Sequence, residues 1–297
     1  MKYMEDIMTT TTVKTINIRG ALRDFRRPWV MGIVNVTPDS FYAGSRTQCV
    51  DDIRARVGRH VADGADCIDI GGYSSRSGAD DISEDEEWRR VATALEVVRG
   101  DWPDVVVSVD TFRADVARKT VEQYGVDIIN DISGGDLCPK MWETIADLRV
   151  AYVLMHMKGT PATMQGLASY DGVAADVLSD LASKVARLRA MGVDDIIIDP
   201  GFGFAKTIDQ NYRLLSELEC FQVLGLPVLA GLSHKSMIWK TLDTTPDKAA
   251  EGTVALDTVA LMKGADIVRV HEVAPAVETV TLLMKMREAS LSNGANG

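Results

Sequence analysis

Eight times along this chain, a short apolar stretch runs directly into a cluster of polar residues. The clearest case is the segment 29–36, Trp-Val-Met-Gly-Ile-Val-Asn-Val, which is followed by Thr37, Asp39 and Ser40. A buried strand is almost continuously apolar and accommodates so many polar groups only where they emerge from its end. The pattern therefore predicts buried strands with polar residues at their carboxyl ends.

Apolar runs and helical periodicity together predict an alternation of strands and helices. The predicted strands are 29–36, 67–71, 104–109, 126–130, 151–157, 195–199, 227–231 and 266–270. The predicted helices are 50–63, 84–99, 113–124, 139–147, 173–191, 209–218, 248–263 and 274–287. Ser83 with Glu86 three residues later is typical of a capping box, and Gly100, Gly125 and Gly192 are expected to follow helix ends.

This alternation, without a Pro/Gly/Ser-rich linker, predicts an α/β protein built as a single (β/α)8 TIM barrel. A doubly wound open sheet is the rival fold, but it seldom needs eight units and its Gly-rich first turn is missing here. We expect the barrel to span 28–288. Residues 1–27 form an N-terminal extension in which 10–27 are expected to make a hairpin that closes the barrel bottom. Residues 289–297 are expected to form a frayed tail.

Composition and charge narrow the classes of partner. The formal net charge of −11 disfavours nucleic acid and anionic membranes. No apolar run reaches the roughly 18 residues that span a bilayer, and the N-terminus does not have the pattern of a signal peptide. The four cysteines are widely spaced, which favours a reduced, cytoplasmic location. An anionic small molecule is still possible, because screening over about 8 Å lets a local cluster of Arg and Lys dominate.

The barrel prediction itself selects candidate site residues, because active sites of such barrels lie at the C-terminal rim. Asp110, Asn130 and Asp199 follow the third, fourth and sixth predicted strands. Carboxylates and carboxamides are natural partners for a flat heterocycle that presents a ring N–H beside an amine. An aspartate at a strand end is equally often a helix cap or turn former, but three that match one flat ligand favour binding.

Several motifs, each after its own predicted strand, resemble the dihydropteroate synthases over about residues 28–288. The motifs are Met31-Gly32-Ile33-Val34-Asn35-Val36-Thr37-Pro38-Asp39-Ser40-Phe41, Asp69-Ile70-Gly71-Gly72-Tyr73-Ser74-Ser75-Arg76, Ser108-Val109-Asp110-Thr111, Asn130-Asp131-Ile132, Asp199-Pro200-Gly201-Phe202-Gly203-Phe204, Lys235-Ser236 and Arg269-Val270-His271. The resemblance implies condensation of 6-hydroxymethyl-7,8-dihydropterin pyrophosphate with p-aminobenzoate, with release of pyrophosphate. It also implies that Lys235 joins the three rim residues in binding pterin.

Pyrophosphate requires positive charge and N–H donors. Arg76, Arg269 and His271 have this chemistry, with the Ser75 hydroxyl beside them. By resemblance, Asn35 is a ligand of a Mg²⁺ ion that also binds the pyrophosphate. A hard cation with few protein ligands and several phosphate oxygens suits that metal.

The second substrate has an aromatic ring and a carboxylate. Ser236, where a helix is expected to start after the seventh strand, is the candidate for the carboxylate, and Phe41 and Phe204 are candidates to flank the ring. No Ser–His or Cys–His pair suggests a covalent intermediate. We therefore expect the electrophile to be activated, with Asp39 stabilising the cation and Lys235, Arg269 and His271 also catalytic.

The resemblance further implies a homodimer and inhibition by sulfonamides. Tyr73, Ser75, Ser77 and His234 depart from the usual family pattern, which puts affinity in doubt rather than the reaction. Two other readings are a pterin-binding methyltransferase and a catalytically silent pterin-binding paralogue. The methyltransferase needs no pyrophosphate cradle, so Arg269 and His271 favour the synthase.

Overall fold

The computed structural model describes residues 13–37, 46–74 and 81–294. Its main sheet has eight parallel strands in the order β8-β7-β6-β5-β4-β3-β10-β9. The strands are β3 (Trp29–Asn35), β4 (Cys67–Gly71), β5 (Val106–Asp110), β6 (Ile128–Asp131), β7 (Ala151–Met155), β8 (Ile196–Asp199), β9 (Leu229–Ala230) and β10 (Ile267–Val270). A parallel bridge between Ile198 and Val228 joins β8 to the chain before β9. The predicted (β/α)8 barrel is therefore confirmed.

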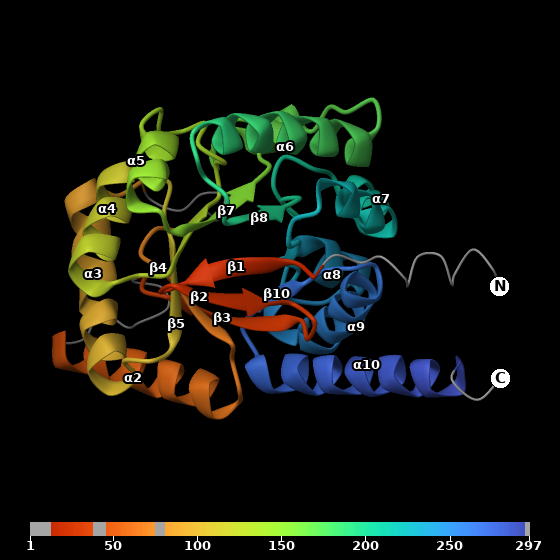
Figure 1. Cartoon of the computed structure of the whole chain (residues 1–297), viewed down its shortest axis with the longest axis horizontal. Coiled ribbons are helices and arrows are strands. Elements are labelled where there is room, and N and C mark those ends of the chain that lie inside the picture. The colour runs from red at the N-terminus through yellow and green to blue at the C-terminus, as the bar shows by residue number, and fades with distance from the viewer. Residues whose placement is uncertain (1–12, 38–45, 75–80, 295–297) are drawn as a thin grey trace.

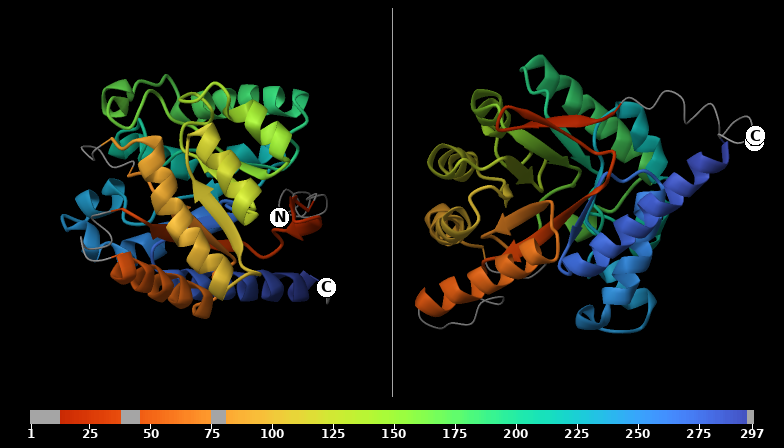
Figure 2. Two further views of the ribbon diagram at one scale, coloured as in Figure 1. Left: turned by 90° about the vertical axis from the view of Figure 1, so that its left-hand side faces the viewer. Right: turned by 60° about the horizontal axis from the view of Figure 1, so that its bottom comes forward.

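Helices surround the strands (Figures 1 and 2). They are α2 (Arg46–Ala62), α3 (Glu84–Asp101), α4 (Ala114–Tyr124), α5 (Met141–Leu148), α6 (Val173–Ala190), α7 (Ile208–Ser216), α8 (Ser236–Thr241), α9 (Ala250–Met262) and α10 (Val273–Gly294). Short 3-10 helices η1 (Met164–Leu167), η2 (Leu218–Leu224) and η3 (Pro246–Lys248) lie between them. Within the described ranges, no helix combines the length and apolarity needed to cross a membrane.

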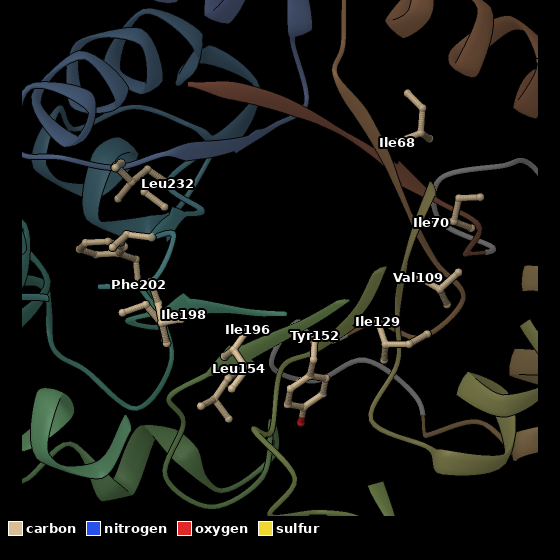
Figure 3. Packing of buried hydrophobic residues seen from close by; sticks show 14 of the residues in the cluster. Ile68, Ile70, Val109, Ile129, Tyr152, Leu154, Ile196, Ile198, Phe202 and Leu232 are labelled. Atoms are coloured by element: carbon tan, nitrogen blue, oxygen red, sulfur yellow. The ribbon is translucent and has the colours of Figure 1, made fainter. Parts of the chain in front are cut away.

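The two faces of the strands form different layers. Outward side chains pack between strands and helices, and Figure 3 shows Ile70, Val109, Tyr152 and Ile198 pointing away from the barrel centre. A second cluster, which includes Met31, Cys67, Ile128, Ile197 and Ile267, packs together with residues of the N-terminal hairpin. Because side chains alternate across a strand, the inward position two residues after each of these lies nearer the C-terminal rim.

The N-terminal residues form the predicted hairpin. Strands β1 (Thr15–Ile18) and β2 (Ala21–Asp24) pair antiparallel, and Ile16 and Ile18 of β1 are buried against the lower barrel cluster. Polar contacts hold the hairpin at its edges: Arg19 Nε donates to Asp127 Oδ1 at 2.7 Å, and Lys14 Nζ donates to Asp266 Oδ2 at 2.7 Å. The hairpin therefore closes the bottom of the barrel.

Several predicted boundaries differ from the structure for identifiable reasons. Gly100 does not follow a helix end, because α3 continues to Asp101 and stops only where Trp102 precedes a proline. Ser83 accepts from the Glu86 N–H, but the Glu86 carboxylate binds Arg89 and Arg90, so only half of the capping box forms.

The seventh predicted strand and the end of the last predicted helix also differ from the structure. The strand predicted at 227–231 is reduced to Leu229–Ala230, because it pairs with β10 only at these two residues and with β8 only through the bridge at Val228. Helix α10 continues to Gly294, beyond the predicted end at residue 287.

Candidate active site

The polar side chains of the site come from alternation along the strands. Cys67 faces the lower cluster, so Asp69, two residues later, faces the barrel interior above it. The same relation places Arg269 above Ile267 and Asp199 above Ile197. Strands that are apolar at their lower inward positions thus end in charged groups that converge on the C-terminal rim.

Arg269 links two of the carboxylates. Its Nε donates to Asp69 Oδ2 at 2.6 Å, and its Nη2 donates to Asp110 Oδ2 at 2.9 Å. Asn130 Nδ2 also donates to Asp69 Oδ2, at 3.1 Å. These contacts connect Asn130, Asp69, Arg269 and Asp110 in one network across β6, β4, β10 and β5. Such charge-assisted bonds fix the direction of each side chain.

Asp110 differs from an ordinary surface carboxylate. Burial raises its pKa to about 7, against the opposing effect of Arg269, and the negative charge of Asp69 adds to the rise. A carboxyl group with a pKa near neutrality can be either a proton donor or a charged acceptor. Asp110 is therefore suited to a ligand that presents N–H donors and carries developing positive charge.

Asp199 and Lys235 form the opposite side of the site. Asp199 Oδ1 accepts from the Gly201 N–H at 2.7 Å, and burial raises the pKa of Asp199 while Lys235 opposes the shift. Lys235 Nζ donates to the Phe202 carbonyl and lies 4.7 Å from the centre of the Phe204 ring. Burial lowers the pKa of Lys235 to about 8. Gly203 has φ +81°, which favours glycine, and a Cβ there would lie 2.9 Å from Lys235 Cδ, so the lysine side chain passes close to this turn.

His271 follows β10 and is held by the chain after β9. Its Nδ1 lies 2.9 Å from Ser233 Oγ, and its backbone N–H donates to the same oxygen at 3.2 Å. The His234 ring packs edge-on against it, with centroids 5.1 Å apart. Ser233 thus fixes the ring of His271 through both contacts.

No group of three His, Cys, Asp or Glu side chains suited to a metal is present within residues 13–37, 46–74 and 81–294. Asn35, at the end of β3, offers a hard carboxamide oxygen. A Cβ on Gly71 would be in ordinary contact with both Asn35 Oδ1 and Asp110 Cβ, 3.5 Å from each, so these two side chains lie close to Gly71 at the end of β4. Among the described residues, this hard oxygen donor fits a Mg²⁺ that takes most of its ligands from phosphate and water.

The structure places most sequence-predicted site residues at one rim. The described ones lie at strand ends, in the loops that follow or at the first position of the next helix: Asn35, Asp110, Asn130, Asp199, Phe204, Lys235, Ser236, Arg269 and His271. Asp39, Phe41, Ser75 and Arg76 lie outside the described residues. Asp69 is the residue that sequence reasoning did not select, although it is fully buried and contacts Arg269. Asp69 could have been selected because it lies two residues after Cys67 on the same strand and therefore faces the barrel interior.

Comparisons with known proteins agree with this geometry. The family model described as "Pterin binding enzyme" matches residues 31–271. The dihydropteroate synthase of Bacillus subtilis is 42% identical over 267 residues, which is 89% of each chain, and that of Escherichia coli is 39% identical over 94% of this chain and 97% of its own.

Solved structures are equally similar. The Yersinia pestis dihydropteroate synthase in a sulfonamide drug complex superposes with a TM-score of 0.86 at 38% identity, covering 92% of this chain and 99% of its own. The Xanthomonas albilineans enzyme with 7,8-dihydropteroate gives a TM-score of 0.82 at 36% identity, covering 92% and 98%. The chain therefore belongs to the dihydropteroate synthases, a family of transferases among the pterin-binding enzymes.

Proposed function

We propose that this chain joins 6-hydroxymethyl-7,8-dihydropterin pyrophosphate to p-aminobenzoate and releases pyrophosphate. The observation that carries the proposal is the arrangement around Arg269, in which one cation is held by Asp69 and Asp110 at the rim of the barrel. Relatives solved with 7,8-dihydropteroate and with 4-aminobenzoic acid support the choice of substrates.

The pterin is proposed to bind between the two sides of the site. Asp110, Asn130 and Asp199 would accept from or donate to the guanidine-like edge of the ring, and Lys235 would reach it from the start of α8. Burial supports this role, because Asn130 and Asp199 are 4% and 6% exposed. In such an environment hydrogen bonds to charged groups are worth about 1.5–3 kcal/mol each.

The proposed reaction breaks the bond between the pterin methylene and the pyrophosphate oxygen and forms a bond to the arylamine nitrogen, which then loses a proton. An arylamine is a weak nucleophile, so the chain must stabilise the departing charges. Arg269 and His271 would bind the leaving pyrophosphate, with Ser75 and Arg76 as further proposed ligands. The carboxyl groups of Asp110 and Asp199 would favour positive charge on the ring, and Asp39 is proposed to act on the methylene.

Asn35 would hold Mg²⁺ together with pyrophosphate oxygens. When bound, the ion would neutralise part of the charge on the leaving group. Phe204, with Phe41, which follows β3 in the sequence, would flank the p-aminobenzoate ring, and Ser236 at the first position of α8 would bind its carboxylate. Sulfonamides are proposed to compete at this second site, since a Yersinia pestis relative was solved with such a drug.

A single assay tests the proposed reaction. Pyrophosphate release from the dihydropterin pyrophosphate is measured with and without p-aminobenzoate, and with and without Mg²⁺. Release that depends on both additions supports the synthase with Mg²⁺. A silent paralogue would release none, and a pterin-binding methyltransferase would instead transfer a methyl group from a methylated tetrahydrofolate.

We expect Asp110→Asn and Asp199→Asn each to weaken pterin binding by about ten- to a hundredfold, because an amide cannot accept two bonds from the ring edge. The measurement is calorimetry with 6-hydroxymethylpterin. Asp209→Asn, at an exposed position of α7, is the matched control and should bind as the unmodified chain does. Unchanged affinity in both Asp110→Asn and Asp199→Asn would contradict the proposed pterin pocket.

We also propose that the chain is a cytoplasmic homodimer. All four cysteines are free thiols, which suits a reducing compartment. Helices α9 and α10 carry exposed apolar side chains, among them Met262 at 63%, Leu282 at 72% and Met286 at 50% exposure. We propose that these side chains contact a second copy, because burial there would remove their apolar surface from water.

Replacing Leu282 and Met286 with glutamate should convert the dimer to a monomer, because the charges would have to be buried unpaired at the interface. Light scattering coupled to gel filtration gives the molar mass. The control is Leu22→Glu, since Leu22 on β2 is 74% exposed but lies on the hairpin. If the double variant keeps the mass of the unmodified protein, α10 is not the interface.

A further inference from the structure

Lys206 is a buried lysine at the end of the loop that carries Asp199 and Phe204. It is only 4% exposed. Its Nζ donates to the Gly201 carbonyl at 2.9 Å and to the Phe204 carbonyl at 3.1 Å, and it lies 3.2 Å from His156 Nδ1. An ammonium group has three protons, and here each proton has one acceptor. The side chain is therefore satisfied entirely by the loop and by His156.

The loop is folded closely around this ammonium group. Gly201 has φ +73°, and a Cβ there would lie 2.0 Å from the His156 carbonyl oxygen and 3.3 Å from Lys206 Nζ. Only glycine fits this turn, which directs the Gly201 carbonyl toward Lys206. The same loop provides the Phe202 carbonyl that binds Lys235 and the Phe204 ring beneath it. The shape of the loop around Lys206 thus determines where Lys235 is held.

Charge links Lys206 to Asp199 as well. Burial lowers the pKa of Lys206 to about 7, and the negative charge of Asp199 opposes this shift. Burial raises the pKa of Asp199, and the positive charge of Lys206 is among the effects that oppose the rise. Burial lowers the pKa of His156 to about 2, so the ring is a neutral acceptor. The charged and titratable groups around Lys206 are His156, Lys158, Tyr170, Asp180, Asp199 and Lys235.

We infer that Lys206 is a positioning residue for pterin recognition, which holds the 199–206 loop in its binding shape and places a buried positive charge within that loop, near Asp199. The inference rests on the proposed role of Asp199 in binding pterin. Lys206 itself does not touch the ligand, since its three protons are directed into the loop and toward His156.

The test measures binding of 6-hydroxymethylpterin by calorimetry to the full chain. Lys206→Met keeps the length of the side chain and removes its charge, and we expect an affinity loss of about tenfold at about pH 6. The difference in affinity from the unmodified chain should shrink at about pH 8.5, because most Lys206 side chains of the unmodified chain are then uncharged as well. Asp110 and Lys235 titrate in the same range, so each variant is compared with the unmodified chain at the same pH.

Lys184→Met is the matched control. Lys184 is 6% exposed, but its Nζ binds Asp136 at 2.7 Å and Asp180 at 3.3 Å rather than the loop. It should bind pterin as the unmodified chain does at both pH values. Equal losses in the two lysine variants, or a loss in Lys206→Met that does not change with pH, would overturn the inference.

A double-mutant cycle separates this inference from the proposed function. If Lys206 acts through Asp199, the loss in Asp199→Asn with Lys206→Met should be smaller than the product of the two single losses. Additive losses would contradict the coupling. If the single variant Asp199→Asn binds pterin normally, the proposed pocket is wrong. If Asp199→Asn loses affinity and the single variant Lys206→Met binds normally, the pocket stands and the inference is wrong. Should Lys206→Met not fold, Lys206→Gln replaces it. Gln also lacks the charge, so its loss should again shrink toward about pH 8.5, but its two N–H donors should make the loss at about pH 6 smaller than that of Met.

Discussion

Arg269→Met should destabilise the protein by about 3–5 kcal/mol and reduce turnover by about two to three orders of magnitude. Methionine keeps most of the side-chain length but removes the only cation bonded to both Asp69 and Asp110 among the described residues. Asp69 is fully buried, and its Oδ1 already has no hydrogen-bond partner. Loss of Arg269 would leave that carboxylate with the Asn130 amide alone. Urea denaturation and the pyrophosphate-release assay measure the two effects.

Arg54→Met is the matched control for this prediction. Arg54 also bonds two carboxylates, Asp51 and Asp101, but its side chain is 47% exposed. A surface pair of this kind contributes about 0–1 kcal/mol. Adding Asp69→Asn to Arg269→Met should recover part of the stability and none of the activity. If Arg269→Met costs no more than Arg54→Met, the buried network does not stabilise the barrel.

Asp257→Asn should stabilise the protein at neutral and alkaline pH, by at least about 1 kcal/mol. Asp257 lies within α9 and is 1% exposed, and neither carboxyl oxygen has a hydrogen-bond partner among the described residues. Burial raises the pKa of Asp257 well above its ordinary value. Between the ordinary pKa and the raised one, the folded state therefore keeps a proton on Asp257 that the unfolded state releases. Because of this difference, the free energy of unfolding falls as pH rises through that interval.

The expected slope is a loss of up to about 1.4 kcal/mol per pH unit over that interval, and Asp257→Asn should abolish it. Denaturant titrations at several pH values measure it. Asp131→Asn is the control, because Asp131 is equally buried but accepts from Ser133, Gly135 and Tyr152. That variant should destabilise. Destabilisation by Asp257→Asn at alkaline pH would mean that its carboxylate has a partner.

The barrel and most of its rim could be predicted from the sequence, because apolar runs that end in polar groups are a local signal. Asp110 and Asp199 could be found for this reason. Asp69 could not be selected in the same way, since it lies in the middle of the run 67–71 and its partner Arg269 is far away in sequence. Charge pairing between distant strands depends on strand order and inward direction, which the local pattern does not contain.

Boundaries were harder to predict where tertiary contacts decide them. The strand at Leu229–Ala230 is shorter than its apolar run because its pairing with β8 is limited to the bridge between Ile198 and Val228. The pairing of Lys206 with loop carbonyls also required the structure, since a lysine after Phe204 and Ala205 has the sequence appearance of an exposed residue. The binding and catalytic roles assigned to the site residues remain predictions, and Asp39, Phe41, Ser75 and Arg76 also lie outside the described residues.

The sparse pairing between β8 and β9 has a mechanical consequence. Seven of the eight neighbouring strand contacts of the barrel are continuous ladders, whereas this one is a single bridge with little backbone to resist separation. Asp199 ends the strand on one side of this seam, and Lys235 follows the strand on the other. A ligand bound by both residues would connect the two strands that share the fewest backbone contacts in the barrel. Substrate occupancy would then tighten the scaffold itself, and the empty enzyme would open most readily beneath its own binding site.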